Sequence, residues 1–241
     1  MRADLFLVEH GYARSRAEAR AAIAAGKVRA NGKTIAKPAQ AIGQGAAVEY
    51  ESAHPYVSRG ALKLVAALDR FELSPENLVC LDLGASTGGF TQVLLERGAQ
   101  KVFAIDVGHG QLDPKVATDS RVISLEGLNA RDLTAEHVAG RPQAIAADMS
   151  FISLKLALPP ALMLAAPGAW LIALVKPQFE AGPEHIGKGG IVKDEAARAT
   201  ALASVVGWIS SVPGWSVLGT MDSPIEGGSG NREYLLAARK S

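Results

Sequence analysis

From Ser58 onward, the sequence alternates between short, almost continuous apolar runs and segments in which apolar residues recur every three or four positions. Alternation of strands with helices is typical of a mostly parallel sheet that has helices on both faces. Strands in such a sheet are buried on both sides, which explains why the runs are almost entirely apolar rather than alternating. The seven runs are Val79–Leu83, Lys101–Ile105, Val122–Leu125, Ala144–Ala147, Ala169–Val175, Trp215–Leu218 and Tyr234–Ala238. We therefore predict an α/β fold with a seven-stranded, mostly parallel sheet.

Helices are expected between these strands. They cover Ser58–Phe71, Gly89–Arg97, Ala135–Ala139, the segment after Phe151, and Ala196–Ser210. One uncharged and mostly apolar stretch, residues 156–175, has the length of a membrane span. Prolines and a glycine interrupt it, and they favour a helix over about 159–166, a turn and a buried strand. We therefore predict no membrane span.

The charges of the chain are unevenly distributed. The whole sequence has 25 Lys and Arg against 24 Asp and Glu, and a net charge of +1 by itself argues against a uniformly basic nucleic-acid-binding protein. The first 47 residues, however, carry eight basic and three acidic side chains, so the rest of the chain is net acidic. A basic segment ahead of an acidic body indicates a separate part that binds a polyanion, with a solvated charged face as the alternative.

This basic segment has its own pattern of elements. Two helices are expected, over Arg2–His10 and after the capping residue Ser15, and Asn31-Gly32 is typical of a tight hairpin turn between two short strands. A last strand is expected over Ala47–Tyr50. We predict a small α+β domain over 1–52, a linker over 53–58 and the α/β domain over 59–241.

Cysteine, histidine and the N-terminus limit the class of protein further. The single cysteine, Cys80, lies in an apolar run, so a buried thiol is expected and an intrachain disulfide is excluded. The five histidines lack the spacing of metal ligands, so we expect no metal. The N-terminus is amphipathic rather than an apolar signal segment, which favours the cytoplasm. A monomer is expected.

A glycine-rich turn follows the first strand of the larger domain, in the order Asp82-Leu83-Gly84-Ala85-Ser86-Thr87-Gly88-Gly89-Phe90. Glycines let the backbone approach a ligand, and doubly wound sheets bind ligands at the carboxyl ends of their strands. Asp106, at the end of the second strand, can accept hydrogen bonds from ribose hydroxyls. A dinucleotide site would need glycine at position 86, where this chain has serine. The spacing resembles instead the motif of S-adenosylmethionine (SAM) methyltransferases.

Charged side chains end several of the apolar strands. They are Asp82, Asp106, Asp148 and Lys176, and all are expected on one edge of the parallel sheet. Because burying an unpaired charge costs on the order of several kcal/mol, charges repeated in this way indicate a functional site rather than four solvated strand ends. From spacing alone, Lys63 and Glu233 are ordinary surface charges.

The sequence resembles, nearly from end to end, the TlyA family of ribosomal RNA cytidine 2′-O-methyltransferases, which are often named haemolysins. The N-terminal segment resembles an S4 RNA-binding domain through Arg2-Ala3-Asp4, Ser15-Arg16-Ala17-Glu18-Ala19-Arg20, Gly26-Lys27-Val28-Arg29 and Asn31-Gly32. The remainder resembles FtsJ-type methyltransferases through Asp82–Phe90, Asp148–Ser150 and Lys176–Glu180. The resemblance implies a Rossmann-like class I SAM methyltransferase fold with a small N-terminal S4-like domain.

The same resemblance implies the site residues. FtsJ-like enzymes use a Lys-Asp-Lys-Glu tetrad, and the matching positions are Lys63, Asp148, Lys176 and Glu233. SAM would be bound by Asp82, Gly84, Ser86, Gly88, Phe90, Asp106, Asn129 and Asp148. The FtsJ pattern has an aspartate where Asn129 stands. Phosphates of ribosomal RNA or a ribosomal subunit would be contacted by Arg2, Arg14, Arg16, Arg20, Lys27, Arg29 and Lys33.

The residue types of the tetrad fit 2′-O-methylation. A ribose 2′-hydroxyl is a poor nucleophile until its proton is removed, and Lys176 is the candidate base. Lys63 would be a second cation that favours the neutral amine, while Asp148 and Glu233 would orient the lysines and the hydroxyl. Because SAM brings an activated methyl group, in-line placement of oxygen, methyl and sulfur is the main contribution of the protein.

We therefore predict SAM-dependent 2′-O-methylation of a cytidine in ribosomal RNA. The length of the chain resembles that of shorter family members, which favours 23S RNA as the target, with 16S RNA as a possible second one. Two alternatives stay open. A membrane-active cytolysin is suggested by the haemolysin label of the family, and a non-catalytic ribosome assembly factor would bind RNA without transferring a methyl group.

Overall fold

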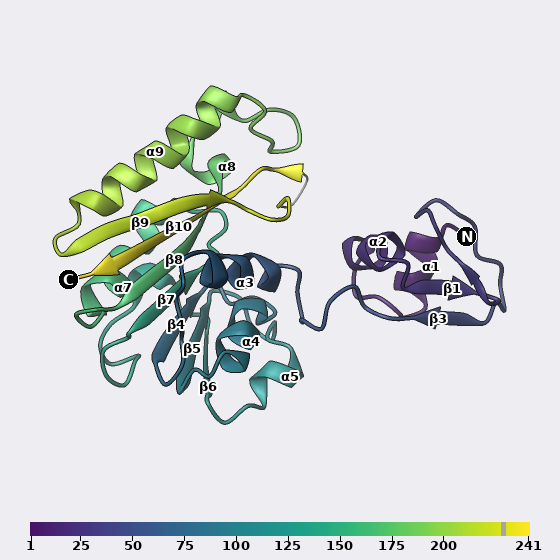
Figure 1. Ribbon diagram of the computed structural model, residues 1–241, viewed down its shortest axis with the longest axis horizontal. Helices are drawn as coiled ribbons and strands as arrows, with labels where there is room; N and C mark the ends of the chain where they lie inside the picture. The colour runs from purple at the N-terminus through teal and green to yellow at the C-terminus, as the bar shows by residue number, and fades with distance from the viewer. Residues whose placement is uncertain (228–229) are drawn as a thin grey trace. The chain divides into compact units, whose positions relative to one another are not determined.

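The computed structural model describes residues 1–227 and 230–241. The chain folds into two compact units, Met1–Pro55 and Tyr56–Ser241 (Figure 1). Each unit has its own buried apolar core, and each is described by itself. The domain limits predicted from the sequence, 1–52, 53–58 and 59–241, stay a prediction.

The N-terminal unit combines two helices with a three-stranded sheet. The helices are α1 (Ala3–Glu9) and α2 (Arg16–Ala24), and the antiparallel strands are β1 (Val28–Ala30), β2 (Lys33–Thr34) and β3 (Val48–Tyr50), in the order β2-β1-β3. The Ser15 side chain caps α2 by accepting a hydrogen bond from the Glu18 N–H. Asn31 and Gly32 both have positive φ, as a two-residue hairpin turn of this type requires.

The larger unit is built on one sheet of seven strands, in the order β6-β5-β4-β7-β8-β10-β9. The strands are β4 (Val79–Leu83), β5 (Lys101–Asp106), β6 (Val122–Glu126), β7 (Ala144–Ala147), β8 (Trp170–Val175), β9 (Trp215–Asp222) and β10 (Tyr234–Lys240). β10 is antiparallel to both of its neighbours, whereas the other neighbouring strands pair in parallel. The predicted fold class, a seven-stranded and mostly parallel sheet, is confirmed.

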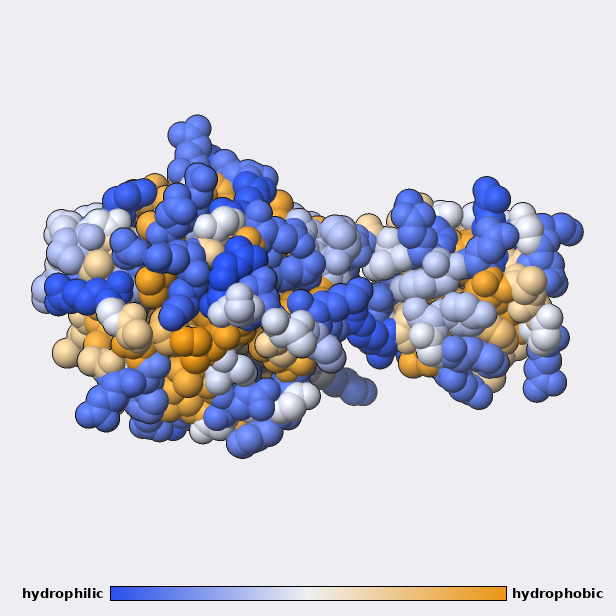
Figure 2. Space-filling model, turned by 90° about the horizontal axis from the view of Figure 1, so that it is seen from below, coloured by the Kyte–Doolittle hydropathy of each residue, from blue (hydrophilic) through white to orange (hydrophobic). Residues whose placement is uncertain are grey.

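Helices cover both faces of this sheet (Figure 1). One face packs against α3 (Ala61–Arg70), α4 (Gly89–Glu96) and α5 (Pro114–Ala117), and the other against η1 (Ala130–Asp132), α6 (Leu154–Ala157), α7 (Pro159–Leu164) and α9 (Glu195–Ser211). Two short pieces, α8 (Pro177–Glu180) and η2 (Pro183–His185), follow β8. Every residue of β7 and β8 is buried as a result. On the surface, hydrophilic and hydrophobic residues are mixed (Figure 2).

One predicted helix is wrong. The segment Ala135–Ala139 forms turns, and Val138 is its single buried apolar side chain. The Thr134 N–H donates to His137 Nδ1 at 3.1 Å, a contact that closes a local turn. A segment this short gains too few hydrogen bonds to offset the cost of starting a helix. The helix α5, which begins with the capping residue Asp113 and Pro114, was not predicted, and β9 runs four residues beyond its predicted end at Leu218.

The apolar stretch over residues 156–175 forms the end of α6, α7, a turn and β8. Within residues 1–227 and 230–241, no helix has the length and apolar character that a membrane crossing needs.

Candidate functional site

The charged residues predicted at strand ends lie along one edge of the sheet. Asp106 is the last residue of β5, Asp148 directly follows β7, and Lys176 directly follows β8. Glu233 precedes β10, which runs in the opposite direction and pairs Tyr234 with Val175 at the end of β8. The reversed strand therefore brings Glu233 to the edge at which the parallel strands end.

The glycine-rich turn after β4 lies close against neighbouring segments. Gly84 has a φ of 79°, and a Cβ at that position would stand 2.6 Å from the Asp148 carbonyl oxygen. Gly88 has a φ of 90°, and a Cβ there would stand 2.7 Å from Leu112. Glycine is required at both positions by conformation and by space. The turn consequently brings the start of α4 next to Asp148.

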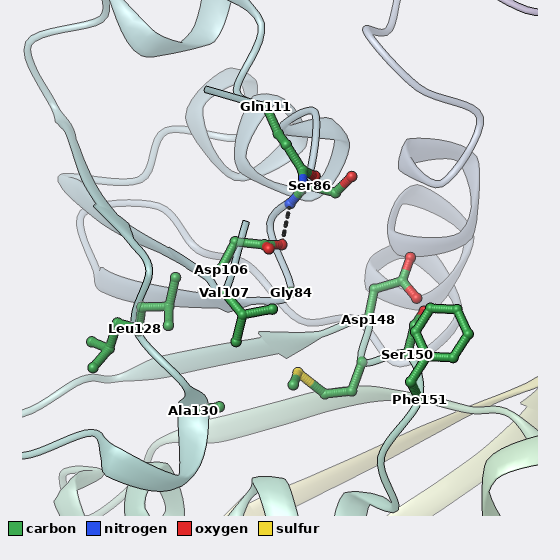
Figure 3. Close-up of a pocket in the computed structure, with 12 residues that line it drawn as sticks. Gly84, Ser86, Asp106, Val107, Gln111, Leu128, Ala130, Asp148, Ser150 and Phe151 are labelled. Atoms are coloured by element: carbon green, nitrogen blue, oxygen red, sulfur yellow. Dashed lines mark hydrogen bonds between the residues drawn. The ribbon is translucent and has the colours of Figure 1, made fainter. Parts of the chain in front are cut away.

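A first cavity of about 320 Å³ opens beside this turn (Figure 3). Its apolar walls come from Val107, Leu128, Ala130 and Met149, and its polar side from Ser86, Asp106 and Asp148. The Asp106 carboxylate accepts hydrogen bonds from the Ser86 N–H at 2.8 Å and from the Gly108 N–H at 2.7 Å. The first cavity thus has apolar walls and a fixed carboxylate on one side.

A second cavity of about 180 Å³ adjoins the first, because both are lined by Gly84, Ser86 and Asp148. It extends over Thr87 and Phe90 to the side chain of Lys63. Two joined cavities, one with apolar walls and one that ends at charged groups, suit an elongated ligand with an aromatic end and a charged end.

A third cavity of about 390 Å³ lies on the other side of the charged residues. It is lined by Ser150, Phe151, Lys176, Gln178, Phe179, Ile186, Gly189, Gly190, Asn231 and Glu233. Lys63 and Asp148 line the second cavity, whereas Lys176 and Glu233 line the third. The predicted tetrad therefore stands on the boundary between the two spaces.

The tetrad forms two ion pairs across this boundary. The Lys63 ammonium contacts the Glu233 carboxylate, and Lys176 Nζ lies 2.6 Å from Asp148 Oδ1. The second contact lacks hydrogen-bond geometry, and Nζ donates its hydrogen bond to Ser150 Oγ at 2.7 Å instead. Lys63 and Glu233 are both buried, so their pair is shielded from bulk water, whereas the pair of buried Lys176 with half-buried Asp148 is shielded less.

Three residues predicted to bind SAM do not line the cavities. Asp82 is fully buried, its Oδ2 accepts a hydrogen bond from Thr91 Oγ1 at 2.6 Å, and burial raises the pKa of its carboxyl to about 7. Asn129 uses its side chain to accept a hydrogen bond from the Arg131 N–H. Gly88 packs against Leu112 and Val116. Asp82 and Gly88 support the turn from beneath, and Asn129 fixes the start of η1.

The structure adds site residues to which the sequence assigned no role. Ser150, the last residue of the Asp148–Ser150 motif, lines both the first and the third cavity. Phe151 is 91% exposed and has a positive φ of 64°, and its ring centroid lies 5.3 Å from that of Phe179. The position of Ser150 and Phe151 at the end of the Asp148–Ser150 motif was the available signal, but the direction of their side chains depends on the loop conformation.

In the N-terminal unit, the structure brings together three of the predicted RNA-binding arginines. Asp4, which is buried, accepts hydrogen bonds from Arg2, Arg16 and Arg20 at 3.0–3.2 Å. These hydrogen bonds hold the pKa of Asp4 far below its usual range.

The other predicted RNA-binding residues lie elsewhere on this unit. Lys27 forms an exposed ion pair with Glu51 at 2.7 Å, and Lys27 and Arg29 line a shallow polar hollow beside β3. Arg14 precedes α2, and Lys33 is exposed on β2. Across the part of the chain that the structure describes, no group of three or more His, Cys, Asp and Glu side chains could hold a metal ion.

Comparisons with known proteins agree with the division of the chain into two units. Residues 56–240 match the FtsJ-like methyltransferase family, and residues 1–48 match the S4 domain. The chain is 47% identical over 240 residues to the 16S/23S rRNA (cytidine-2′-O)-methyltransferase TlyA of Mycobacterium tuberculosis, which covers 99% of this chain and 89% of that protein. It is 38% identical over 181 residues to the 23S rRNA (cytidine-2′-O)-methyltransferase TlyA of Campylobacter jejuni, over 75% of this chain and 69% of that protein. A solved structure from Streptococcus thermophilus, named a haemolysin, is 40% identical, with a TM-score of 0.77 over 100% of this chain and 88% of that one.

Proposed function

Because the chain belongs to the TlyA family of FtsJ-like methyltransferases, we propose that it transfers the methyl group of SAM to the ribose 2′-hydroxyl of a cytidine in ribosomal RNA. One observation carries this proposal: each ion pair of the tetrad joins a residue of the second cavity to a residue of the third. Groups able to take a proton from a hydroxyl therefore stand between a space for the methyl donor and a space for a nucleotide.

The first and second cavities fit SAM. Their apolar walls suit adenine, Asp106 suits the ribose hydroxyls, and the second cavity has room for the methionine end beside Gly84 and Phe90. SAM supplies a methyl group that is already activated on a sulfonium sulfur. Asp148 lines both cavities, so it borders the place where the adenosine and methionine ends would meet. The eight SAM-binding residues inferred from the family thus divide into lining residues and supporting ones.

We assign Lys176 as the base that takes the proton of the 2′-hydroxyl. The amine must be neutral for this role, so the ammonium paired with Asp148 has to give up a proton before the hydroxyl is deprotonated. The Nζ of Lys176 is held in place by Asp148 and Ser150 and faces the third cavity, where the ribose would enter. Glu233, paired with Lys63, lines the same cavity and can orient the hydroxyl. Lys63 and Asp148 complete the tetrad from the side of the cofactor.

The third cavity suits a nucleotide that has left its stack. Phe151 and Phe179 offer aromatic faces on which a flipped base can stack, and they lie within a few residues of the tetrad. The basic N-terminal unit would hold the surrounding RNA by its phosphates, which position an enzyme without selecting a sequence.

Both TlyA relatives are named for 23S rRNA and one of them also for 16S rRNA, so we propose 23S ribosomal RNA as the first target and 16S as the second. Because ribosomal RNA is modified where ribosomes assemble, we keep the cytoplasm as the proposed location.

The test is methyl transfer from labelled SAM to purified ribosomal subunits, followed by mapping of the product. We expect 2′-O-methylcytidine in 23S RNA. Lys176→Ala should lower the rate at least ~100-fold while leaving SAM affinity within about threefold. Lys115→Ala, a change at an exposed lysine of α5, should change neither the rate nor the SAM affinity. RNA binding without transfer by the unaltered protein would favour an assembly factor, and leakage of liposomes without SAM binding would favour a cytolysin.

A further inference from the structure

The loop after β7 and the segment after β8 are joined at two places. Lys176 Nζ donates a hydrogen bond to Ser150 Oγ at 2.7 Å. Four residues further along the second segment, the Glu180 carboxylate accepts hydrogen bonds from Ser153 Oγ and from the Leu154 N–H, both at 2.7 Å. The two segments are therefore fastened at both ends of α8.

Glu180 also fixes the start of α6. Ser153 is the N-cap of that helix and accepts a hydrogen bond from the Lys155 N–H, while Glu180 takes up the Leu154 N–H that the helix leaves free. Burial of Glu180 raises its pKa, and the two hydrogen bonds act in the opposite direction. Burial therefore opposes the charged form of Glu180, and the hydrogen bonds from Ser153 and Leu154, both in one turn, stabilise it.

The loop that Glu180 holds is short and conformationally strained. It begins at Asp148, whose N–H donates to the Leu83 carbonyl of β4 at 2.9 Å, and it ends at Ser153. Between these points, Phe151 adopts a φ of 64°, a conformation that costs about 1–3 kcal/mol outside glycine and persists where neighbours enforce it. Within this loop, Ser150 and Asp148 are the groups that contact Lys176.

We propose that Glu180 is a positioning residue for methyl transfer: by fixing the end of the 148–153 loop, it holds Ser150 and Asp148 against Lys176. This inference rests on the proposed function and assigns a role to a residue outside the tetrad. Glu180 lines none of the three cavities, so it acts through the loop rather than on a reacting atom.

The test compares three variants of the full chain in the methyl-transfer assay. Glu180→Ala should lower kcat about 10- to 100-fold, because small misplacements of a catalytic group have effects of this size. The Kd for SAM should stay within about threefold of that of the unaltered protein. Glu180→Gln should recover most of kcat, since its carbonyl can accept from the Leu154 N–H and its amide can donate to Ser153. Glu184→Ala, which removes an exposed carboxylate from the following turn, should leave kcat unchanged.

A double mutant separates positioning from a general loss of stability. If Glu180 acts through the two contacts to Lys176, then adding Glu180→Ala to Lys176→Ala should lower kcat by less than about threefold further. Losses that multiply would overturn the proposal, as would a Glu180→Ala variant with the kcat of Glu184→Ala or one whose sole defect is a lower Tm. If the unaltered protein transfers no methyl group to RNA, the proposed function fails before this comparison begins.

Discussion

The ion pair between Lys63 and Glu233 allows its structural and catalytic contributions to be measured separately. The two side chains are 8% and 2% exposed, so either charge is buried when its partner is neutralised. Lys63→Met or Glu233→Gln alone should therefore destabilise the larger unit by about 3–5 kcal/mol, the cost typical of an uncompensated buried charge. Neutralising both removes both charges but leaves the Gln amide buried beside Met, and we expect the double variant to lose only about 1–3 kcal/mol, the cost of an unsatisfied buried polar group.

These free energies correspond to measurable melting temperatures. For a unit of about this size, 1 kcal/mol shifts Tm by roughly 2–4 °C, so each single variant should melt about 6–20 °C lower. The double variant should recover a large part of that difference. Methyl transfer, by contrast, should stay at least ~100-fold below that of the unaltered protein in all three variants, because the pair borders the space in which the hydroxyl would react.

The assay is a double-mutant cycle in which thermal unfolding and methyl transfer are measured on the same preparations. Stability losses that simply add would contradict the burial argument, since independent sites behave in that way. A double variant that regains both stability and methyl transfer would show that the pair only supports the fold, and the assignment of Lys63 and Glu233 to the tetrad would then be abandoned.

Three further predictions follow from individual carboxylates. Asp106→Ala should raise the Kd for SAM about 10- to 100-fold in calorimetric titration, as expected for a lost hydrogen bond to a charged group. Burial raises the pKa of Asp82 to about 7, so the stabilisation by its protonated carboxyl is complete below about pH 4 and is lost as the pH rises through 7. Between pH 5 and 8, the Tm of the unaltered protein should therefore fall relative to that of Asp82→Asn. Asp4 has a lowered pKa, so its contribution is present above about pH 4 and is lost on acidification. Its arginine partners are half exposed and screened, so Asp4→Asn should cost only about 1–2 kcal/mol at pH 7 by scanning calorimetry.

Each of these three predictions would be contradicted by one specific result. An unchanged Kd in Asp106→Ala would mean that the ribose is bound elsewhere. Parallel curves of Tm against pH for Asp82→Asn and the unaltered protein would mean that the buried carboxyl does not titrate in this range. An Asp4→Asn variant as stable as the unaltered protein at pH 7 would show that solvent cancels the three arginine contacts.

The strands could be predicted closely because burial on both faces leaves a plain signal. Val79–Leu83 and Ala144–Ala147 have in the structure the limits that the apolar runs indicated. The predicted helix over Ala135–Ala139 failed because its apolar spacing covers little more than one turn, and local contacts such as that between Thr134 and His137 decide such a short segment. Periodicity is informative where many residues share one environment, and weak where one or two contacts decide.

The same distinction applies to the site. Parallel strands end at one edge whatever their loops do, so the nearness of Asp106, Asp148 and Lys176 follows from the order of the strands. Ser150 and Phe151 could not be placed in this way, because their directions depend on a positive φ within the loop. Asp82 shows the opposite error: its motif indicated a ligand contact, whereas its carboxyl lies beneath the turn and bonds to Thr91.

The pairing within the tetrad has an electrostatic consequence for the proposed reaction. Two buried lysines next to the second cavity would repel a sulfonium, and the repulsion between unit charges at short range is strong where water is excluded. Pairing Lys63 with Glu233 and Lys176 with Asp148 makes the four groups neutral as a set, so the lysines can stand near a cationic methyl donor. Both carboxylates also border the cavities, one on each side of the boundary. Neutralising one carboxylate alone should therefore weaken SAM binding as well as methyl transfer, whereas neutralising one lysine alone should weaken only the transfer. SAM titration of Asp148→Asn and Lys176→Met would measure this contrast directly.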